Sequence, residues 1–75
     1  MMRYYFHIRD HAALIPDDEG MELSGMAAAT AEALISVNDL VLADVRSGHV
    51  SSTSLEICDR RGHMLDALAI RRSLH

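Results

Sequence analysis

Hydrophobic and polar positions alternate at the start of the chain. In residues 3–9, RYYFHIR, aromatic and β-branched side chains recur with a period of two, as in a half-buried strand. Such a strand has two distinct faces, with Tyr4, Phe6 and Ile8 on one and Tyr5, His7 and Arg9 on the other. We expect the first set to face the core, because a core offers few partners for imidazole and guanidinium groups.

The next stretch, DHAALIPDDEGMEL, is rich in turn residues. Pro16 and Gly20 bracket three consecutive acids, so we expect the chain to turn between short extended pieces at residues 13–15 and 20–23. Gly20 is expected to supply a positive φ, and Asp17 to accept local backbone N–H bonds. The segment therefore predicts a hairpin or a strand-like excursion after the first strand.

Residues 24–47 predict one long helix. They contain no proline and many alanines, Ser24 can cap the start, and Gly48 stands where a glycine commonly ends a helix. A turn of about 100° per residue groups one wide apolar arc, which we expect to face the sheet. Its members are Met26, Thr30, Ala33, Leu34, Val37, Leu40, Val41 and Val45.

A second apolar stripe lies beside this arc. Ile35 and Leu42 are seven positions apart and are joined by Ala28, Ala31 and Asn38. A monomeric domain of two layers has nothing to cover this stripe. We therefore predict that Ile35 and Leu42 contribute to self-association.

The last third of the chain predicts a second hairpin. The sequence LEICDRRGHMLDALAI places two apolar segments around Asp59–Gly62, and Asp at the first position with Gly at the fourth suits a type I turn. Whether the loop has three or four residues stays open, as does whether Met64 or Leu65 shares a face with Ile57. The chain as a whole predicts an α+β fold, ββαββ, with one long helix packed on a small, mainly antiparallel sheet.

Length and composition point to one domain, residues 1–75, with a thin core. Nearly half of the residues are apolar, but only three are aromatic, so a partner would add stability. The net charge of −4 makes nucleic acid an unlikely partner. One cysteine excludes an internal disulfide, and no pattern of a signal peptide or a membrane span is found. These features predict a cytoplasmic protein with no membrane partner.

No catalytic, cofactor-binding or metal-binding residue is predicted. His7 and His11 would lie about 13 Å apart on a strand, too far for one tetrahedral ion. The acids of DDEG lack the ligand spacing of calcium loops. Cys58 and His63 flank the second turn, but a nucleophilic cysteine also needs an oriented base and a pocket. We therefore expect neither an enzyme nor a cofactor.

The arginines are the remaining polar feature. If the second hairpin lies beside the first strand, they could form one ligand patch, consisting of Arg3, Tyr5, His7, Arg9, Arg60 and Arg61. Guanidinium groups next to an aromatic ring suit a phosphorylated ligand or a single-stranded nucleic acid. Because the chain is acidic, a solvated turn is the preferred interpretation of these arginines, and weak binding is the alternative.

Four segments together resemble a known family. RYYFHIRD, IPDDEGMEL, AAATAEAL and DRRGHMLDAL occur in an order and spacing similar to those of small proteins common in rhizobia and related alphaproteobacteria. That family is catalogued as a domain of unknown function. The resemblance implies a bacterial, cytoplasmic, single-domain protein and carries no activity to transfer.

The sequence thus predicts a small, non-enzymatic interaction module that forms a homo-oligomer or binds another protein, as yet unidentified. Two modes of self-association stay open: packing of helices through Ile35 and Leu42, or pairing of an exposed strand edge.

Overall fold

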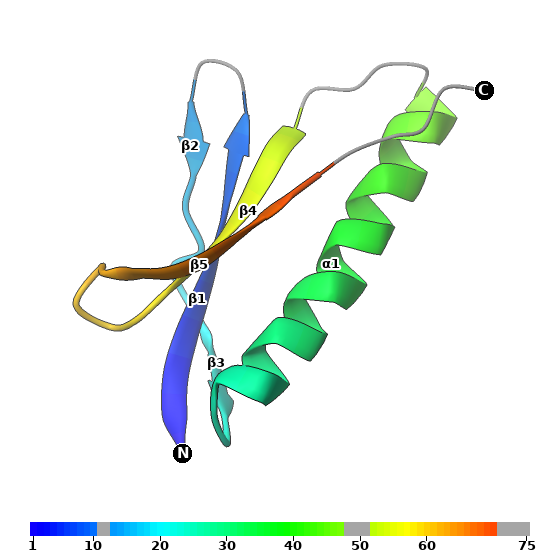
Figure 1. Cartoon of the computed structure of the whole chain (residues 1–75). Coiled ribbons are helices and arrows are strands. Elements are labelled where there is room, and N and C mark those ends of the chain that lie inside the picture. Colours follow the sequence, from blue (N-terminus) through cyan, green and yellow to red (C-terminus); the bar gives the residue numbers. More distant parts are fainter. Residues whose placement is uncertain (11–12, 48–51, 71–75) are drawn as a thin grey trace.

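The chain forms one helix and a five-stranded antiparallel sheet (Figure 1). The computed structural model describes residues 1–10, 13–47 and 52–70, of which 43–47 and 52–53 as backbone only. The elements in chain order are β1 (Met2–Asp10), β2 (Leu14–Ile15), β3 (Met21–Leu23), α1 (Met26–Ser47), β4 (Ser52–Cys58) and β5 (Met64–Ala69). The predicted α+β class is confirmed. Three strands precede the helix rather than two, because both short extended pieces pair with β1.

Strand β1 is the centre of the sheet. Strand β4 pairs along one edge of β1 and is followed by β5, whereas β2 and β3 pair in succession along the other edge. Strand β2 lies opposite Ile8 and Arg9, and β3 lies opposite Met2–Tyr4. The connector between β2 and β3 therefore passes the middle of β1 without ladder pairing.

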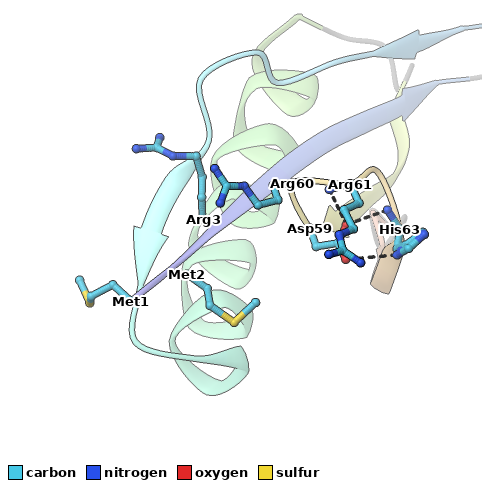
Figure 2. Close-up of a pocket in the computed structure, with 7 residues that line it drawn as sticks. All are labelled: Met1, Met2, Arg3, Asp59, Arg60, Arg61 and His63. Carbon is cyan, nitrogen blue, oxygen red and sulfur yellow. Dashed lines mark hydrogen bonds and ion pairs between the residues drawn. The ribbon is translucent and has the colours of Figure 1, made fainter.

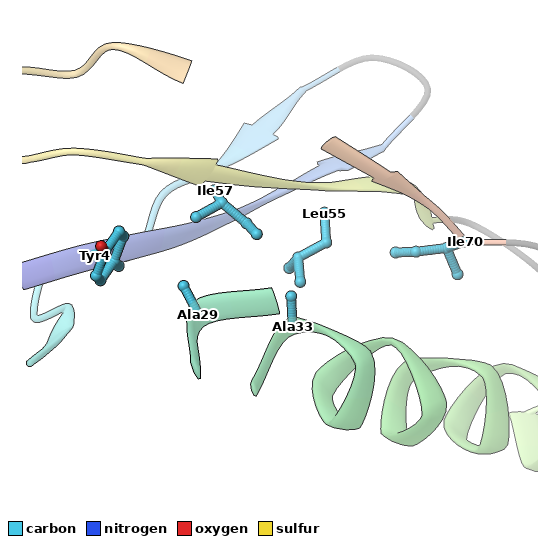
Figure 3. Packing of buried hydrophobic residues seen from close by; sticks show 6 residues of the cluster. All are labelled: Tyr4, Ala29, Ala33, Leu55, Ile57 and Ile70. Carbon is cyan, nitrogen blue, oxygen red and sulfur yellow. The ribbon is translucent and has the colours of Figure 1, made fainter. Parts of the chain in front are cut away.

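The predicted faces of β1 are confirmed. Phe6 pairs with Ile57, and Ile8 with Leu55, on the face that carries the core. The buried cluster consists of Tyr4, Ala29, Ala33, Leu55, Ile57 and Ile70, with Phe6 and Ile8 packed against it (Figure 3). Among the described residues, the largest side chains that are fully buried are those of Leu55 and Ile57, and Tyr4 is 3% exposed. The core is thin, as the composition indicated.

The cap of the helix lies one residue after the predicted one, and the helix begins at Met26. The N–H of Ala29 donates to the carbonyl oxygen of Gly25 over 3.1 Å, which makes Gly25 the capping residue. The prediction of Ser24 as the cap is therefore wrong. Gly48, predicted to end the helix, lies outside the described residues.

The helix contacts the sheet through a narrower arc than predicted. Ala29 and Ala33 are completely buried and point at the sheet, and their small side chains let the helix backbone approach Leu55 and Ile57 (Figure 3). This contact turns Leu34 away, and its side chain is 54% exposed. The assignment of Leu34 to the core is wrong, and Ala29 was missed. The side chain of Val45, from the same arc, lies outside the described residues.

The second hairpin has a three-residue loop. The N–H of Asp59 donates to the carbonyl of His63 and the N–H of Gly62 donates to the carbonyl of Asp59, which leaves residues 60–62 as the loop. Gly62 has a φ of 86°, as expected when a type I turn is followed by a left-handed residue. Asp66 lies opposite Ile57, and the register shifts before Cys58, which pairs with Met64.

Within the described ranges, no helix combines the length and the apolar character needed to cross a membrane.

Substitution of Gly20 is predicted to destabilise the fold strongly. Gly20 has a φ of 72°, and a Cβ atom there would lie 2.9 Å from the backbone oxygen of Tyr4 and 2.9 Å from side-chain atoms of Arg3 and Tyr5. Gly62 also has a positive φ, but a Cβ there would meet nothing within 4 Å. Gly62→Ala should cost about 1 kcal/mol from backbone strain alone, and Gly20→Ala at least about 2 kcal/mol. Urea denaturation measures both, and equal losses would contradict the role of crowding.

Candidate functional site

Two adjoining hollows lie beside the turn that joins β4 to β5. The first, of about 380 Å³, is called the arginine hollow and is lined by Met1, Met2, Arg3, Asp59, Arg60, Arg61 and His63 (Figure 2). The second, of about 320 Å³, is called the tyrosine hollow and is lined by Tyr5, His7, Asp17, Asp18, Asp59, Arg60 and Gly62. Asp59 and Arg60 belong to both, so the turn separates the two hollows.

The carboxylate of Asp59 holds the turn in shape. Its Oδ1 accepts the N–H groups of Arg61 and His63, each over 2.9 Å, and its Oδ2 lies 3.4 Å from Nδ1 of His63 (Figure 2). The bond from the His63 N–H contributes most to a lowered pKa of Asp59; desolvation opposes it, and the Arg61 N–H and the His63 side chain add to the lowering. Asp59 therefore stays charged at neutral pH and fixes the loop from its first position.

The carboxylate of Asp17 performs a similar task in the other connector. Its Oδ1 accepts the N–H groups of Glu19 and Gly20, over 3.2 and 3.1 Å, as the turn chemistry predicted. Its Oδ2 accepts the N–H of Phe6 over 3.1 Å. Burial would raise the pKa of Asp17, but the three backbone N–H donors outweigh it, with a smaller electrostatic contribution from the nearby His7, so the pKa is lowered.

His7 and Tyr5 lie side by side on the outer face of the sheet. Their rings are stacked, with centroids 6.4 Å apart and planes inclined by 22°. The N–H of Asp17 donates to Nδ1 of His7 over 2.9 Å, so this nitrogen is an acceptor and the ring proton belongs to Nε2. His11, considered above as its partner in metal binding, lies outside the described residues.

Two of the predicted patch arginines are held by acids or carbonyls. Arg3 donates to the carbonyl of Glu19 over 2.7 Å and to the carboxylate of Glu22 over 3.3 Å. Nε of Arg9 donates to Glu56 over 2.8 Å, and this hydrogen bond and charge raise the pKa of Arg9. These contacts restrain both guanidinium groups on the surface.

The predicted patch is only partly assembled. Arg3, Arg60 and Arg61 line the arginine hollow, and Tyr5, His7 and Arg60 line the tyrosine hollow. Arg9 lines neither, because it pairs with Ser54 at the far end of β4, whereas the turn follows Cys58, opposite Tyr5. The register of β1 and β4 therefore separates Arg9 from the other arginines.

Cys58 and His63 do not form a thiol–imidazole pair in the part of the chain that the structure describes. The imidazole of His63 lies against Asp59, while Cys58 is 4% exposed and pairs with Met64. Burial, with the charges of Glu56 and Asp59, raises the pKa of the Cys58 thiol and lowers its reactivity. Among residues 1–10, 13–47 and 52–70, no three side chains form a group suited to hold a metal ion.

The resemblance noticed in the sequence can now be compared with known families. The model of a domain of unknown function, DUF6894, matches residues 3–71. The chain belongs to this family. The DUF6894 match covers the helix, the tyrosine hollow and the arginine hollow except for Met1 and Met2. It supplies no activity, and no curated protein or solved structure matches the chain.

The sequence predicts only some of the contacts that Asp17 and Asp59 make. Asp17 was expected to bond only locally, and its contacts with Phe6 and His7 depend on how the connector lies along β1. Asp59 is predicted as the first residue of a turn, and an Asp at this position commonly accepts hydrogen bonds from the N–H groups of the loop. Its partner His63 had no such signal.

Replacement of Asp17 is predicted to weaken the fold in a pH-dependent way. Asp17→Asn turns an NH₂ group toward backbone N–H groups, which then lose their acceptor. At pH 7 the free energy of unfolding should fall by about 1–2 kcal/mol, a modest loss because the site is partly exposed. Since the pKa of Asp17 is lowered in the fold, its stabilisation is complete above the ordinary pKa of 3.8 and is lost as the pH falls through the lower folded value. The difference between wild type and variant should therefore shrink in acid.

Asp18→Asn is the matched control. Asp18 is the exposed neighbour of Asp17, and within the described residues its carboxylate makes no hydrogen bond, so its loss should change stability by less than about 0.5 kcal/mol. Urea denaturation from pH 3 to pH 7 compares the two variants. A loss for Asp17→Asn that is the same at every pH would contradict the role of the charged carboxylate.

Proposed function

We propose that this domain is a non-enzymatic interaction module that forms a homodimer through the exposed face of α1. The observation that carries the proposal is a run of uncharged positions on that face, called the outer stripe. Leu34, Ile35 and Leu42 are 54%, 55% and 53% exposed. The stripe consists of Ala27, Ala31, Leu34, Ile35, Asn38 and Leu42, all exposed. Large apolar side chains that gather on one surface are typical of a protein interface.

The outer stripe is complementary to itself. Leu34, Asn38 and Leu42 are four residues apart and form one ridge along the helix. A two-fold axis through Asn38 sets two such ridges antiparallel, with Leu34 against the partner's Leu42 at both ends. The amide of Asn38 both donates and accepts hydrogen bonds, so it can pair with its own copy on the axis. This symmetry favours a second copy of the chain over an unrelated partner.

Charges border the stripe without entering it. Glu32 and Asp39 lie on the same flank of the helix, next to Ile35. The interface is small, because three half-exposed apolar side chains are far fewer than the 20–30 residues that a standard interface takes from each partner. The expected dimer is reversible, with a Kd on the order of 10 μM.

Pairing through the edge of β5 is the competing mode. Within the described residues β5 pairs only with β4, so its outer edge is open. Asp66 lies opposite Ile57 on the core side of this strand, and the register shifts beside it. A charged residue on an edge strand and an irregular ladder are features by which proteins prevent edge pairing. They favour the helix as the interface.

Charged substitutions in the outer stripe are predicted to abolish the dimer. Ile35→Glu together with Leu42→Glu places two carboxylates in each copy's interface, so the protein should sediment as a monomer at concentrations where the wild type is dimeric. Far-UV circular dichroism should stay unchanged, since both side chains are already exposed. Met64→Glu together with Leu65→Glu, on exposed positions of β5, is the control and should leave the dimer intact.

Asn38→Asp refines this test, because it keeps the shape of the side chain and adds a charge on the two-fold axis. We expect the Kd of the dimer to rise at least about tenfold at pH 7. A wild-type chain that sediments as a monomer at high micromolar concentration would refute the proposal. Loss of the dimer only in the β5 variant would move the interface to the strand edge.

A further inference from the structure

The arginine hollow presents cationic donors for which the described part of the chain offers no acceptor. Of the four arginines whose side chains are described, Arg3 and Arg9 are held by Glu22 and Glu56. The side chains of Arg60 and Arg61 are exposed and form no hydrogen bond or ion pair within the described residues. In that part of the chain the guanidinium groups of these two neighbouring residues therefore have no partner, although the net charge of the protein is −4.

Among the described residues that line this hollow, the one acid is already engaged. Asp59 accepts two backbone N–H groups of the loop and faces the imidazole of His63 (Figure 2). Arg60 extends from the turn toward Arg3, while Arg61 lies beside Asp59 and His63 (Figure 2). The charge that remains in the arginine hollow is positive.

The tyrosine hollow is less suited to an anion. Asp18 lines it with a carboxylate that makes no hydrogen bond within the described ranges. Asp17 adds a second negative charge beside His7. An anionic ligand is therefore expected on the other side of the turn, in contact with Arg60 and Arg61.

We propose that the arginine hollow binds a phosphate group through the guanidinium forks of Arg60 and Arg61. A guanidinium matches the spacing of two phosphate oxygens, and two such groups can engage a dianion from two sides. A volume of about 380 Å³ is at the small end of the range for ligand sites and admits a phosphate with a small group attached. Arg3, already paired with Glu22, lines the hollow and is not counted as a third fork.

The turn is preorganised for this role. Asp59 and the positive φ of Gly62 fix the loop backbone before any ligand arrives, so only the arginine side chains need to be ordered on binding. The site lies at the β4–β5 turn and shares no residue with the outer stripe. The inference therefore goes beyond the proposed dimer and does not depend on it.

Titration of the full chain with pyrophosphate tests the site. Isothermal calorimetry at about 20 mM salt should detect binding, and the affinity should fall as salt is added, because exposed charges are screened. In a ¹H–¹⁵N correlation spectrum the shifts should concentrate at residues 59–63. Arg60→Gln together with Arg61→Gln should weaken binding at least about tenfold.

Arg9→Gln is the matched control, since it removes a positive charge from a paired arginine that lines neither hollow. The affinity of this variant for pyrophosphate should stay within about twofold of wild type. Arg60→Lys together with Arg61→Lys keeps the charge and loses the forks, so it should bind more weakly than wild type. No binding at millimolar pyrophosphate, or equal losses for the Arg9 and Arg60/Arg61 variants, would overturn the inference. If the lysine variant binds pyrophosphate as well as wild type, the proposal of forked guanidinium contacts is wrong.

A single-stranded oligothymidylate of about ten nucleotides identifies the source of the phosphate. Tighter binding than pyrophosphate, lost in the Arg60/Arg61 glutamine variant, assigns the site to a nucleic-acid backbone. Binding no tighter than pyrophosphate assigns it to small phosphorylated molecules. The Ile35/Leu42 glutamate variant should bind pyrophosphate like wild type, so failure of the dimer and failure of this site are distinguishable.

Discussion

The fold depends on the carboxylate of Asp17, which accepts a hydrogen bond from a backbone N–H in the middle of the central strand β1. Strands β2 and β3 pair with the two ends of the same edge of β1, and the connector between them leaves the ladder. At that gap Oδ2 of Asp17 accepts the N–H of Phe6, in place of a backbone carbonyl. A backbone donor next to the core must find an acceptor, and this bond allows the strand to be interrupted at little cost. It also brings the Asp17 N–H to His7 and so fixes the imidazole on the outer face.

The small size of the core explains which side chains remain on the surface. Ala29 and Ala33 let the helix approach the sheet closely, but their side chains are small, and Leu55 and Ile57 are the largest fully buried side chains in the described part of the chain. The core is too small to bury all apolar side chains of α1, and those of the outer stripe remain exposed. The carboxylates of Asp17 and Asp59 accept hydrogen bonds from backbone N–H groups. They are therefore not used to pair with Arg60 and Arg61, which face the solvent. Membership of the DUF6894 family adds no ligand or partner to these surfaces.

Much of the fold could be read from the sequence where the determinant is local. The two faces of β1 follow from alternation, the positive φ of Gly20 from turn chemistry, and the helix from its alanines and lack of proline. The rest depends on how elements are placed. Helix rotation decides that Ala29 is buried and Leu34 is not, and no local signal sets it. The loop length and the bulge decide that Asp66 meets Ile57, and the β1–β4 register removes Arg9 from the arginine hollow.

The central position of β1 also shapes how the chain reaches this fold. The ribosome makes β1 before its long partner β4, because the whole helix lies between them in the sequence. Short-range pairs such as the β4–β5 hairpin close within microseconds, whereas joining β1 to β4 closes a large loop and has a high entropic cost. Folding should therefore be limited by this one long-range pairing. Until β4 emerges, the nascent chain keeps the future centre of its sheet open on one side.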